Sequence, residues 1–119
     1  MRIVITGGRD YNNKDFIWET LDALHAETKI TLLATGACYL GGADLHAENW
    51  AKAREVDYFG MPAKFKTGKR GKAEGMIRNG RLLDTIRPDK VVAFPGGVGT
   101  DGCVKEAIKR RLKVIDKRS

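Results

Sequence analysis

A chain of 119 residues is long enough to bury one hydrophobic core and too short for two, which predicts a single domain over residues 1–119. Hydrophobic residues make up 42% and charged residues 31% of the sequence, a balance that excludes a disordered chain, and no apolar run is long enough to cross a membrane. The formal net charge of +7 favours anionic partners, among them nucleotides, nucleic acids and acidic proteins.

The first predicted element is a buried strand at residues 2–6 (RIVIT), which ends directly in a glycine pair. Asn12 and Asn13 are candidate caps for a helix over residues 14–27. Apolar side chains recur in that helix at i, i+4 and i+7, so one of its faces is expected to be buried.

The second predicted strand covers residues 30–34 and leads to Gly36, and a weaker, alternating third strand covers residues 56–60. Between them a helix is expected to begin near Ala43 or Asp44, with alanine at every fourth position, which suits close packing on a sheet. Asp44 lies in the first turn, where the helix dipole favours a carboxylate. Two roles stay open for it, capping residue and ligand contact.

Residues 62–71 resemble a loop with four cationic side chains, which is either a flap over a polyanion or a solvated surface loop. The next helix is predicted over residues 72–85. The residues expected to face its core side are Met76, Ile77, Gly80 and Leu83. Arg78 and Asn79 lie beside that stripe, within reach of solvent or of the edge of the sheet.

The most informative stretch begins with an apolar run at residues 91–94, which predicts a buried strand. Pro95 and a cluster of glycines follow it, and Thr100 is expected to cap a helix over residues 100–111. The apolar stripe expected on that helix is Val104, Ala107 and Ile108. A short last strand follows at residues 112–115. A strand, a glycine turn and a helix N-terminus together present free N–H groups and the positive end of a dipole, a usual phosphate site. The alternative is that the glycines only make a tight turn.

Strands alternate with helices along the chain, which predicts an α/β fold: a single Rossmann-like three-layer domain with a parallel sheet of about five strands. Right-handed crossovers favour the strand order 3-2-1-4-5. The first and fourth strands are neighbours in that order, so their glycine turns open onto one crevice at the carboxyl edge of the sheet, where such folds bind ligands.

Several motifs of known chemistry fail on their context. The glycines at residues 97–102 have the G-x-G-x-x-G spacing but do not follow the first strand, which argues against a dinucleotide-dependent dehydrogenase. Gly68 and Lys69 lack the upstream glycine of a P-loop. Neither histidine is spaced with other metal ligands, and no nucleophile–histidine–acid set is present. We therefore expect no metal and no cofactor.

Four segments resemble a known family: VITGGRD at residues 4–10, GADLHAENWA at 42–51, MIRNGRLL at 76–83 and PDKVVAFPGGVGT at 88–100. In this order, over nearly the whole chain, they are similar to the YspA-type, cpYpsA-related SLOG proteins. The SLOG superfamily is Rossmann-like and binds nucleotides or nucleotide-derived ligands. It includes the lysine decarboxylase-like phosphoribohydrolases and the DNA-binding protein DprA. The resemblance implies a nucleoside phosphate or ADP-ribose-type ligand.

The phosphoribohydrolases carry P-G-G-x-G-T-x-x-E, in which the Glu is catalytic and an upstream Arg assists it. The glycine part of that motif is present here and Arg78 resembles the arginine, but Cys103 stands in place of the Glu. Cleavage of an N-glycosidic bond needs a carboxylate to stabilise charge on the ribose or to activate water. The candidate carboxylates are Glu106, one helical turn or about 5 Å beyond Cys103, Asp101 and Asp44.

The expected ligand-binding residues come from the two glycine turns and the polar side chains beside them. Thr100 and the backbone of residues 96–99 would hold a phosphate, and Arg9 and Arg78 would contact phosphate or ribose. Asp44 would accept from a ribose hydroxyl. The alternative for both arginines is a surface salt bridge. The full predicted set is Gly7, Gly8, Arg9, Gly36, Asp44, Arg78, Asn79, Pro95, Gly96, Gly97, Gly99 and Thr100.

Three functions follow from these residues. The first is a nucleotide-binding protein, acting as a sensor or in nucleotide processing, and the second is a nucleoside 5′-monophosphate N-glycosidase. The third is a DNA- or RNA-binding protein, which rests on the net charge and the basic loop. It ranks last because only Phe65 adds an aromatic platform there.

Location and assembly are less constrained. Cys38 and Cys103 stand far apart and no signal peptide precedes the first strand, so we expect reduced thiols and a cytoplasmic protein without a membrane partner. A homo-oligomer could form through helix faces bearing Trp18 or Trp50, with core packing as the alternative.

Overall fold

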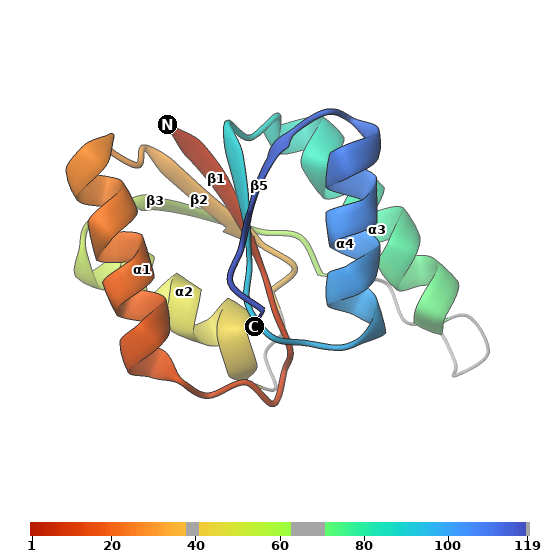
Figure 1. Cartoon of the computed structure of the whole chain (residues 1–119), viewed down its shortest axis with the longest axis horizontal. Helices are drawn as coiled ribbons and strands as arrows, with labels where there is room; N and C mark the ends of the chain where they lie inside the picture. Colours follow the sequence, from red (N-terminus) through yellow and green to blue (C-terminus); the bar gives the residue numbers. More distant parts are fainter. Residues whose placement is uncertain (38–40, 63–70, 119) are drawn as a thin grey trace.

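The computed structural model describes residues 1–37, 41–62 and 71–118, in which strands and helices alternate along the chain (Figure 1). The strands are β1 (Arg2–Thr6), β2 (Leu32–Thr35), β3 (Asp57–Gly60), β4 (Lys90–Ala93) and β5 (Lys113–Asp116). The helices are α1 (Lys14–Glu27), α2 (Gly42–Ala53), α3 (Gly71–Ile86) and α4 (Val98–Lys109).

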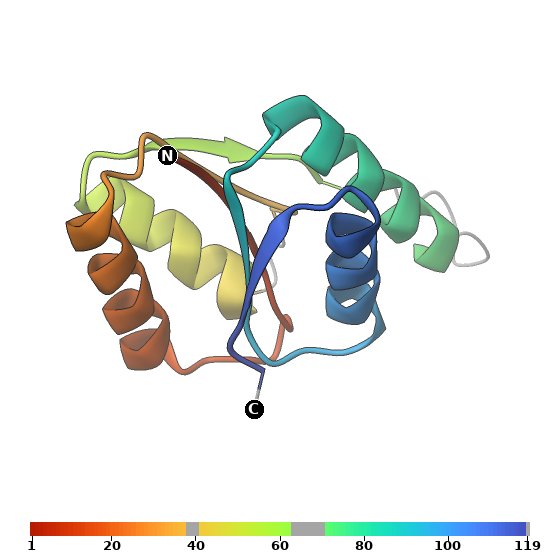
Figure 2. The same cartoon turned by 45° about the horizontal axis from the view of Figure 1, so that its top comes forward.

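All described pairings in the sheet are parallel, and the strand order is β3-β2-β1-β4-β5, as the sequence predicts. Helices α1 and α2 cover one face of the sheet and α3 and α4 cover the other, a three-layer Rossmann-like arrangement seen in both views (Figures 1 and 2). The α/β class is therefore confirmed. Because β1 and β4 are hydrogen-bonded neighbours, the two glycine turns that follow them lie together.

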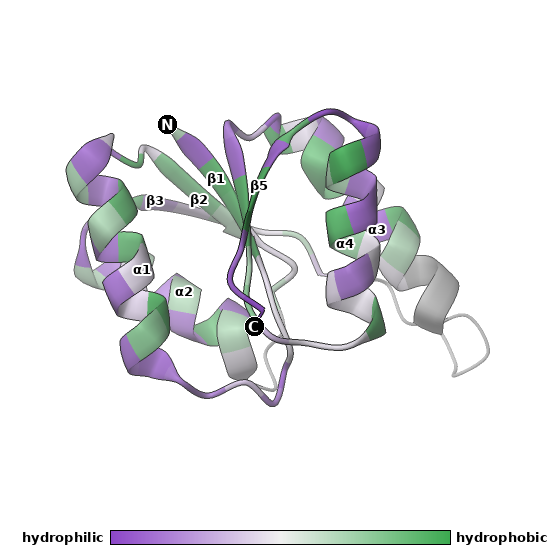
Figure 3. Ribbon diagram, in the orientation of Figure 1, coloured by the Kyte–Doolittle hydropathy of each residue, from purple (hydrophilic) through white to green (hydrophobic). Residues whose placement is uncertain are grey.

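The core is divided by the sheet into two clusters. The cluster between the sheet and helices α1 and α2 contains Trp50, which is fully buried. The cluster between the sheet and helices α3 and α4 contains Leu82 and Leu83. Figure 3 shows the hydrophobic colour on the sides of the helices and strands that face each other. Asn13 caps α1 through a side chain that accepts from Phe16 N at 3.2 Å, as expected for one of the two candidate asparagines.

Three residues predicted to lie in the core are exposed. Met76 and Ile77 are 51% and 49% exposed, and Ile108 is 61% exposed. The buried stripe of α3 instead runs through Asn79, Leu82, Leu83 and Ile86, at i, i+3, i+4 and i+7. The stripe was misplaced because its first member is a polar residue, which an apolar pattern does not reveal.

The strand boundaries differ by one or two residues from the prediction. The second strand begins at Leu32 rather than at Ile30, because Ile30 N donates to His25 Nδ1 at 2.9 Å and joins the end of α1 instead. Most of the predicted basic loop and Cys38 lie outside the described residues. No helix in the described ranges is long and apolar enough to span a membrane.

Candidate functional site

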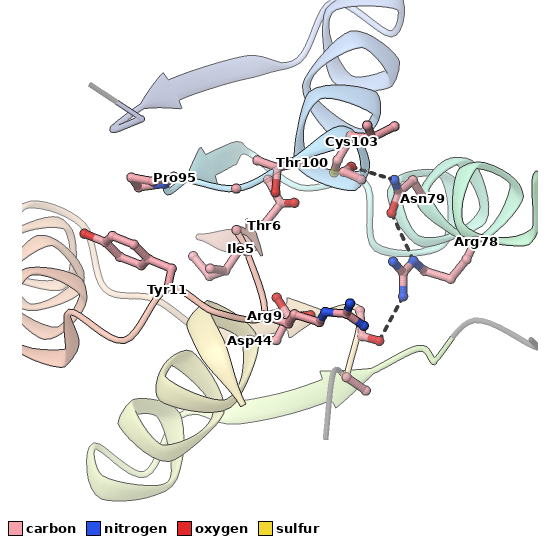
Figure 4. A pocket seen from close by; sticks show the side chains of 18 of the residues that line it. Ile5, Thr6, Arg9, Tyr11, Asp44, Arg78, Asn79, Pro95, Thr100 and Cys103 are labelled. Carbon is pink, nitrogen blue, oxygen red and sulfur yellow. Dashed lines mark hydrogen bonds between the residues drawn. The ribbon is translucent and has the colours of Figure 1, made fainter. Parts of the chain in front are cut away.

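A cavity of about 890 Å³ opens at the carboxyl edge of the sheet, between the ends of β1, β2 and β4 and the starts of α2 and α4 (Figure 4). This volume lies in the range of small-molecule sites. All twelve residues that the sequence predicts to bind a ligand line it. They come from segments more than ninety residues apart in the chain, which the parallel sheet brings to one edge.

The two glycine turns are hydrogen-bonded to each other. Gly8 N donates to Pro95 O at 2.8 Å. A Cβ atom on Gly96 would lie 2.6 Å from Gly8 N and would collide with Thr100 Oγ1. Only glycine therefore allows the turn after β4 to approach the turn after β1 this closely.

A second close approach sets the start of α2. Gly42 has φ +79°, and a Cβ atom there would lie 2.5 Å from the carbonyl carbon of Arg9. Ala43 N donates to Gly8 O at 3.1 Å. The helix therefore begins against the first glycine turn, which puts Asp44 in its first turn and on the cavity wall.

The start of α4 differs from the prediction that Thr100 is its N-cap. The helix begins at Val98, its N-cap is Gly97, and no side chain makes a capping hydrogen bond. Thr100 is the third residue of the helix, within its first turn, and is 4% exposed. The first N–H groups of a helix have no partner within it, so the uncapped end of α4 points donors and a positive dipole at the cavity.

Arg78 and Asn79, on α3, form hydrogen bonds to the segments that follow β2 and β3 and to the start of α4. Arg78 Nη1 donates to Gly36 O at 2.9 Å and to Met61 O at 3.3 Å, and its Nε donates to Asn79 Oδ1 at 3.0 Å. Asn79, which is 4% exposed, donates through Nδ2 to Gly99 O at 3.2 Å. Figure 4 shows this chain of hydrogen bonds and the side chains of Arg9 and Arg78 extending toward each other. The guanidinium of Arg78 is thus fixed by carbonyl oxygens.

The three candidate carboxylates do not meet. Asp44 lines the cavity. Asp101 pairs with Arg118 Nη1 at 2.7 Å and lines a smaller hollow beside Pro95. Glu106 pairs with Arg110 Nη1 at 2.9 Å, and neither it nor Asp101 is among the described residues that line the main cavity.

Cys103, which stands where the phosphoribohydrolase motif has its Glu, lies at the cavity and is 1% exposed. Burial raises the pKa of its thiol to about 11, with a hydrogen bond from Thr6 acting weakly in the opposite direction. The thiol is therefore neutral near pH 7 and supplies neither a carboxylate nor a thiolate.

Several lining residues were not predicted. They are Ile5, Thr6, Asp10, Tyr11, Ala37, Pro62, Leu82, Val98 and Cys103. Tyr11 could have been predicted from the sequence, because it closely follows the first glycine turn. Its ring stacks on Phe94, with centroids 6.1 Å apart. Within the described ranges, no group of three or more His, Cys, Asp or Glu side chains is arranged to hold a metal ion.

Three similar solved structures are UDP-N-acetylglucosamine 2-epimerases. One has a TM-score of 0.64 at 13% identity, the Neisseria meningitidis enzyme bound to UDP-GlcNAc has 0.66 at 12%, and the Rickettsia bellii enzyme has 0.57 at 16%. They cover 97%, 98% and 97% of this chain, which spans 30%, 31% and 30% of theirs. At these identities the likeness shows the fold alone.

Two sequence comparisons go further. The Gene 61 protein of Mycobacterium phage D29 is 31% identical over 123 aligned residues, which include 97% of this chain and 94% of the phage protein. The model of the YspA, cpYpsA-related SLOG family matches residues 1–68. The matched region contains the first glycine turn and the start of α2. The chain belongs to the YspA, cpYpsA-related SLOG family.

Proposed function

We propose that this protein binds a nucleoside phosphate or a related nucleotide-derived ligand in the cavity at the carboxyl edge of its sheet. The observation that carries the proposal is the uncapped N-terminus of α4 against two hydrogen-bonded glycine turns. That arrangement offers several backbone N–H donors and a favourable dipole to one phosphate group.

The side chains around this donor cluster suit the rest of a nucleotide. Arg9 is exposed and lines the cavity, where its guanidinium can make a charge-assisted hydrogen bond to phosphate. Asp44 can accept from a ribose hydroxyl. The UDP-GlcNAc bound by the Neisseria meningitidis epimerase is compatible with a nucleotide ligand on this fold.

Binding without hydrolysis fits the cavity better than N-glycosidic cleavage. A neutral thiol at Cys103 cannot stabilise positive charge on a ribose, and Glu106 and Asp101 are paired with arginines away from the cavity. Asp44 is the one candidate carboxylate among the described residues that line the cavity, and we assign it to contact with a ribose hydroxyl. We therefore propose a binding or sensing role, in which the ligand leaves unchanged.

A thermal-shift titration with AMP, ADP-ribose, UDP-GlcNAc and inorganic phosphate tests the proposal. A ligand at one hundred times its Kd adds about 2.7 kcal/mol to the free energy of unfolding, which raises Tm by roughly 10 °C. Arg9→Ala should weaken binding about tenfold, the lower end for a hydrogen bond to a charged group on an exposed side chain.

Arg81→Ala is the matched control, because Arg81 is an exposed arginine on α3 that is not among the cavity-lining residues. It should bind as the wild type does. The proposal fails if none of the nucleotides shifts Tm, or if Arg81→Ala and Arg9→Ala lose affinity equally. Chromatography of the nucleotide after incubation separates binding from turnover, and release of free base would overturn the non-hydrolytic role.

A further inference from the structure

At the amino edge of the sheet, opposite the cavity, cationic and acidic residues lie at different ends. The first residue of each of three adjacent strands is cationic: Arg2 in β1, Lys90 in β4 and Lys113 in β5. Lys90 and Lys113 are partners in the register of the parallel pair. Figure 3 shows the hydrophilic colour where these strands begin, at the top of the view.

Two more cations lie in the turns that lead into β4 and β5. Arg87 has φ +49° and Arg111 has φ +58°, and both side chains are exposed. Glycine is the usual residue at such left-handed positions after a helix. The equivalent turn before β3 holds Glu55 at φ +57°, and β3 begins with Asp57, so the opposite end of the same edge is acidic.

The basic half of the edge is defined as Arg2, Arg87, Lys90, Arg111 and Lys113. None of the five forms an ion pair with a carboxylate in the described ranges. Two of the described acids lie nearby: Asp89, whose Oδ2 accepts from the backbone N of Arg2 at 2.8 Å, and Asp84, whose pKa is lowered by a hydrogen bond from Arg110 and in part by the charge of Arg87. The side chain of Arg2 donates to Arg87 O, a neutral acceptor, at 3.0 Å.

We propose that this basic half of the amino edge binds the phosphate backbone of a nucleic-acid duplex. Neighbouring strands are about 4.8 Å apart, so the cations at the starts of the three strands and in the turns before two of them lie close together. A duplex carries one negative charge per about 1.7 Å of its axis, and such an array binds it by displacing counter-ions. Among the described residues that begin these three strands or form the turns before β4 and β5, none is aromatic, which favours a duplex over a stacked single strand.

The left-handed turns allow a test in which charge is removed without loss of backbone structure. Glycine accommodates a positive φ better than arginine does, and Arg87 N and Arg111 N keep their hydrogen bonds to Leu83 O and Ile108 O in glycine variants. The double variant R87G/R111G should therefore have a Tm equal to or above that of the wild type. E55G makes the same backbone change at the acidic end of the edge and is the matched control.

The measurement is fluorescence anisotropy of a labelled DNA duplex of about two helical turns, titrated at several salt concentrations. Five phosphate contacts give a slope of log affinity against log salt of about −4.5, and R87G/R111G should reduce it to about −2.7. The double variant should also bind about tenfold more weakly, or worse, at low salt. E55G should bind at least as tightly as the wild type.

A second variant, Lys90→Gln with Lys113→Gln, removes charge from the strands and keeps the test valid if R87G/R111G folds poorly. The proposal is overturned if the wild type does not bind the duplex at low salt, or if both double variants bind as the wild type does. It is equally overturned if E55G loses as much affinity as R87G/R111G. Tighter binding of polyglutamate than of the duplex, at equal charge and equal salt, would overturn the proposal and assign the edge to an acidic protein instead. None of these outcomes depends on the nucleotide cavity.

Discussion

At Gly42 and Gly96 the backbone of one turn lies against the backbone of another, with no room for a side chain. These two contacts hold the walls of the cavity together, because they join the turn after β1 to the start of α2 and to the turn after β4. The neighbouring Gly97 and Gly99 are different, since a Cβ atom on either would meet nothing within 4 Å. A cluster of glycines in the sequence thus contains residues with separate structural roles.

This difference predicts the outcome of two alanine substitutions. Gly96→Ala must push Gly8 N or Thr100 Oγ1 away, so the hydrogen bond from Gly8 N to Pro95 O weakens. We expect the free energy of unfolding to fall by about 1–3 kcal/mol, the range for overpacking. Gly99→Ala should not lower it, because a Cβ atom there meets nothing within 4 Å and alanine is favoured over glycine inside a helix. Urea denaturation of both variants gives the values, and equal losses would contradict this account.

At the scale of elements, helix α3 links the ends of the strands to the start of α4. Asn79 occupies the first position of its buried stripe and uses both ends of its amide, accepting from Arg78 Nε and donating to Gly99 O. Arg78 in turn binds carbonyl oxygens at the ends of β2 and β3. Packing of α3 therefore orients both Arg78 and the glycine turn that precedes α4.

Replacing Asn79 by Leu keeps the branched shape and the number of heavy atoms and removes both hydrogen bonds. We expect a loss of about 2 kcal/mol in the free energy of unfolding, because Arg78 Nε and Gly99 O lose partners in a largely buried site. Asn49→Leu, at an exposed position on α2, should cost less than about 0.5 kcal/mol. Chemical denaturation monitored by circular dichroism compares the two. An Asn79→Leu protein as stable as the wild type would show that the two hydrogen bonds of Asn79 contribute nothing to folding.

At the scale of the whole molecule, the charges separate into two regions. The carboxyl edge combines arginines with backbone donors around the cavity, and the amino edge carries cations toward β5 and acids toward β3. Ion pairs join α1 to the end of α2, join α3 to the end of α4, and lie at the carboxyl end of β5.

These ion pairs predict how stability depends on pH. The hydrogen bond from Arg118 lowers the pKa of Asp116 to about 2, and hydrogen bonds from Arg54 and Arg110 lower the pKa values of Asp22 and Asp84. A carboxyl whose pKa is lower in the folded state stabilises it above the unfolded pKa, and this stabilisation is lost as pH falls through the folded pKa.

The free energy of unfolding should therefore decrease as pH falls from about 4, the pKa of an unfolded aspartate, toward the folded pKa of about 2. In the triple variant D22N/D84N/D116N, the free energy of unfolding should decrease less steeply over this pH window. Asp15→Asn is the control, because Asp15 forms no ion pair within the described ranges. Denaturant midpoints measured across the window test this, and parallel curves for wild type and triple variant would contradict it.

The local pattern of the sequence determined the elements, their alternation and the strand order. An apolar run followed by glycines is a signal between neighbouring residues, and right-handed crossovers then leave few topologies. For this reason the two glycine turns, the residues at the carboxyl edge and the parallel order 3-2-1-4-5 could all be predicted. The exact start of α4 could not, because Thr100 and Gly97 are both acceptable caps and tertiary packing chose between them.

Only the tertiary structure decided what each polar residue contacts. Arg78 and Gly36 are 42 positions apart, and nothing local in either segment indicates that the guanidinium binds that carbonyl. The exposure of Met76 and the burial of Asn79 were hidden for the same reason, since the face of α3 that packs is set by the sheet beneath it. The basic half of the amino edge likewise exists only once three strands from distant parts of the chain lie side by side. Sequence periodicity determines local structure, whereas contacts between distant segments depend on the packed fold.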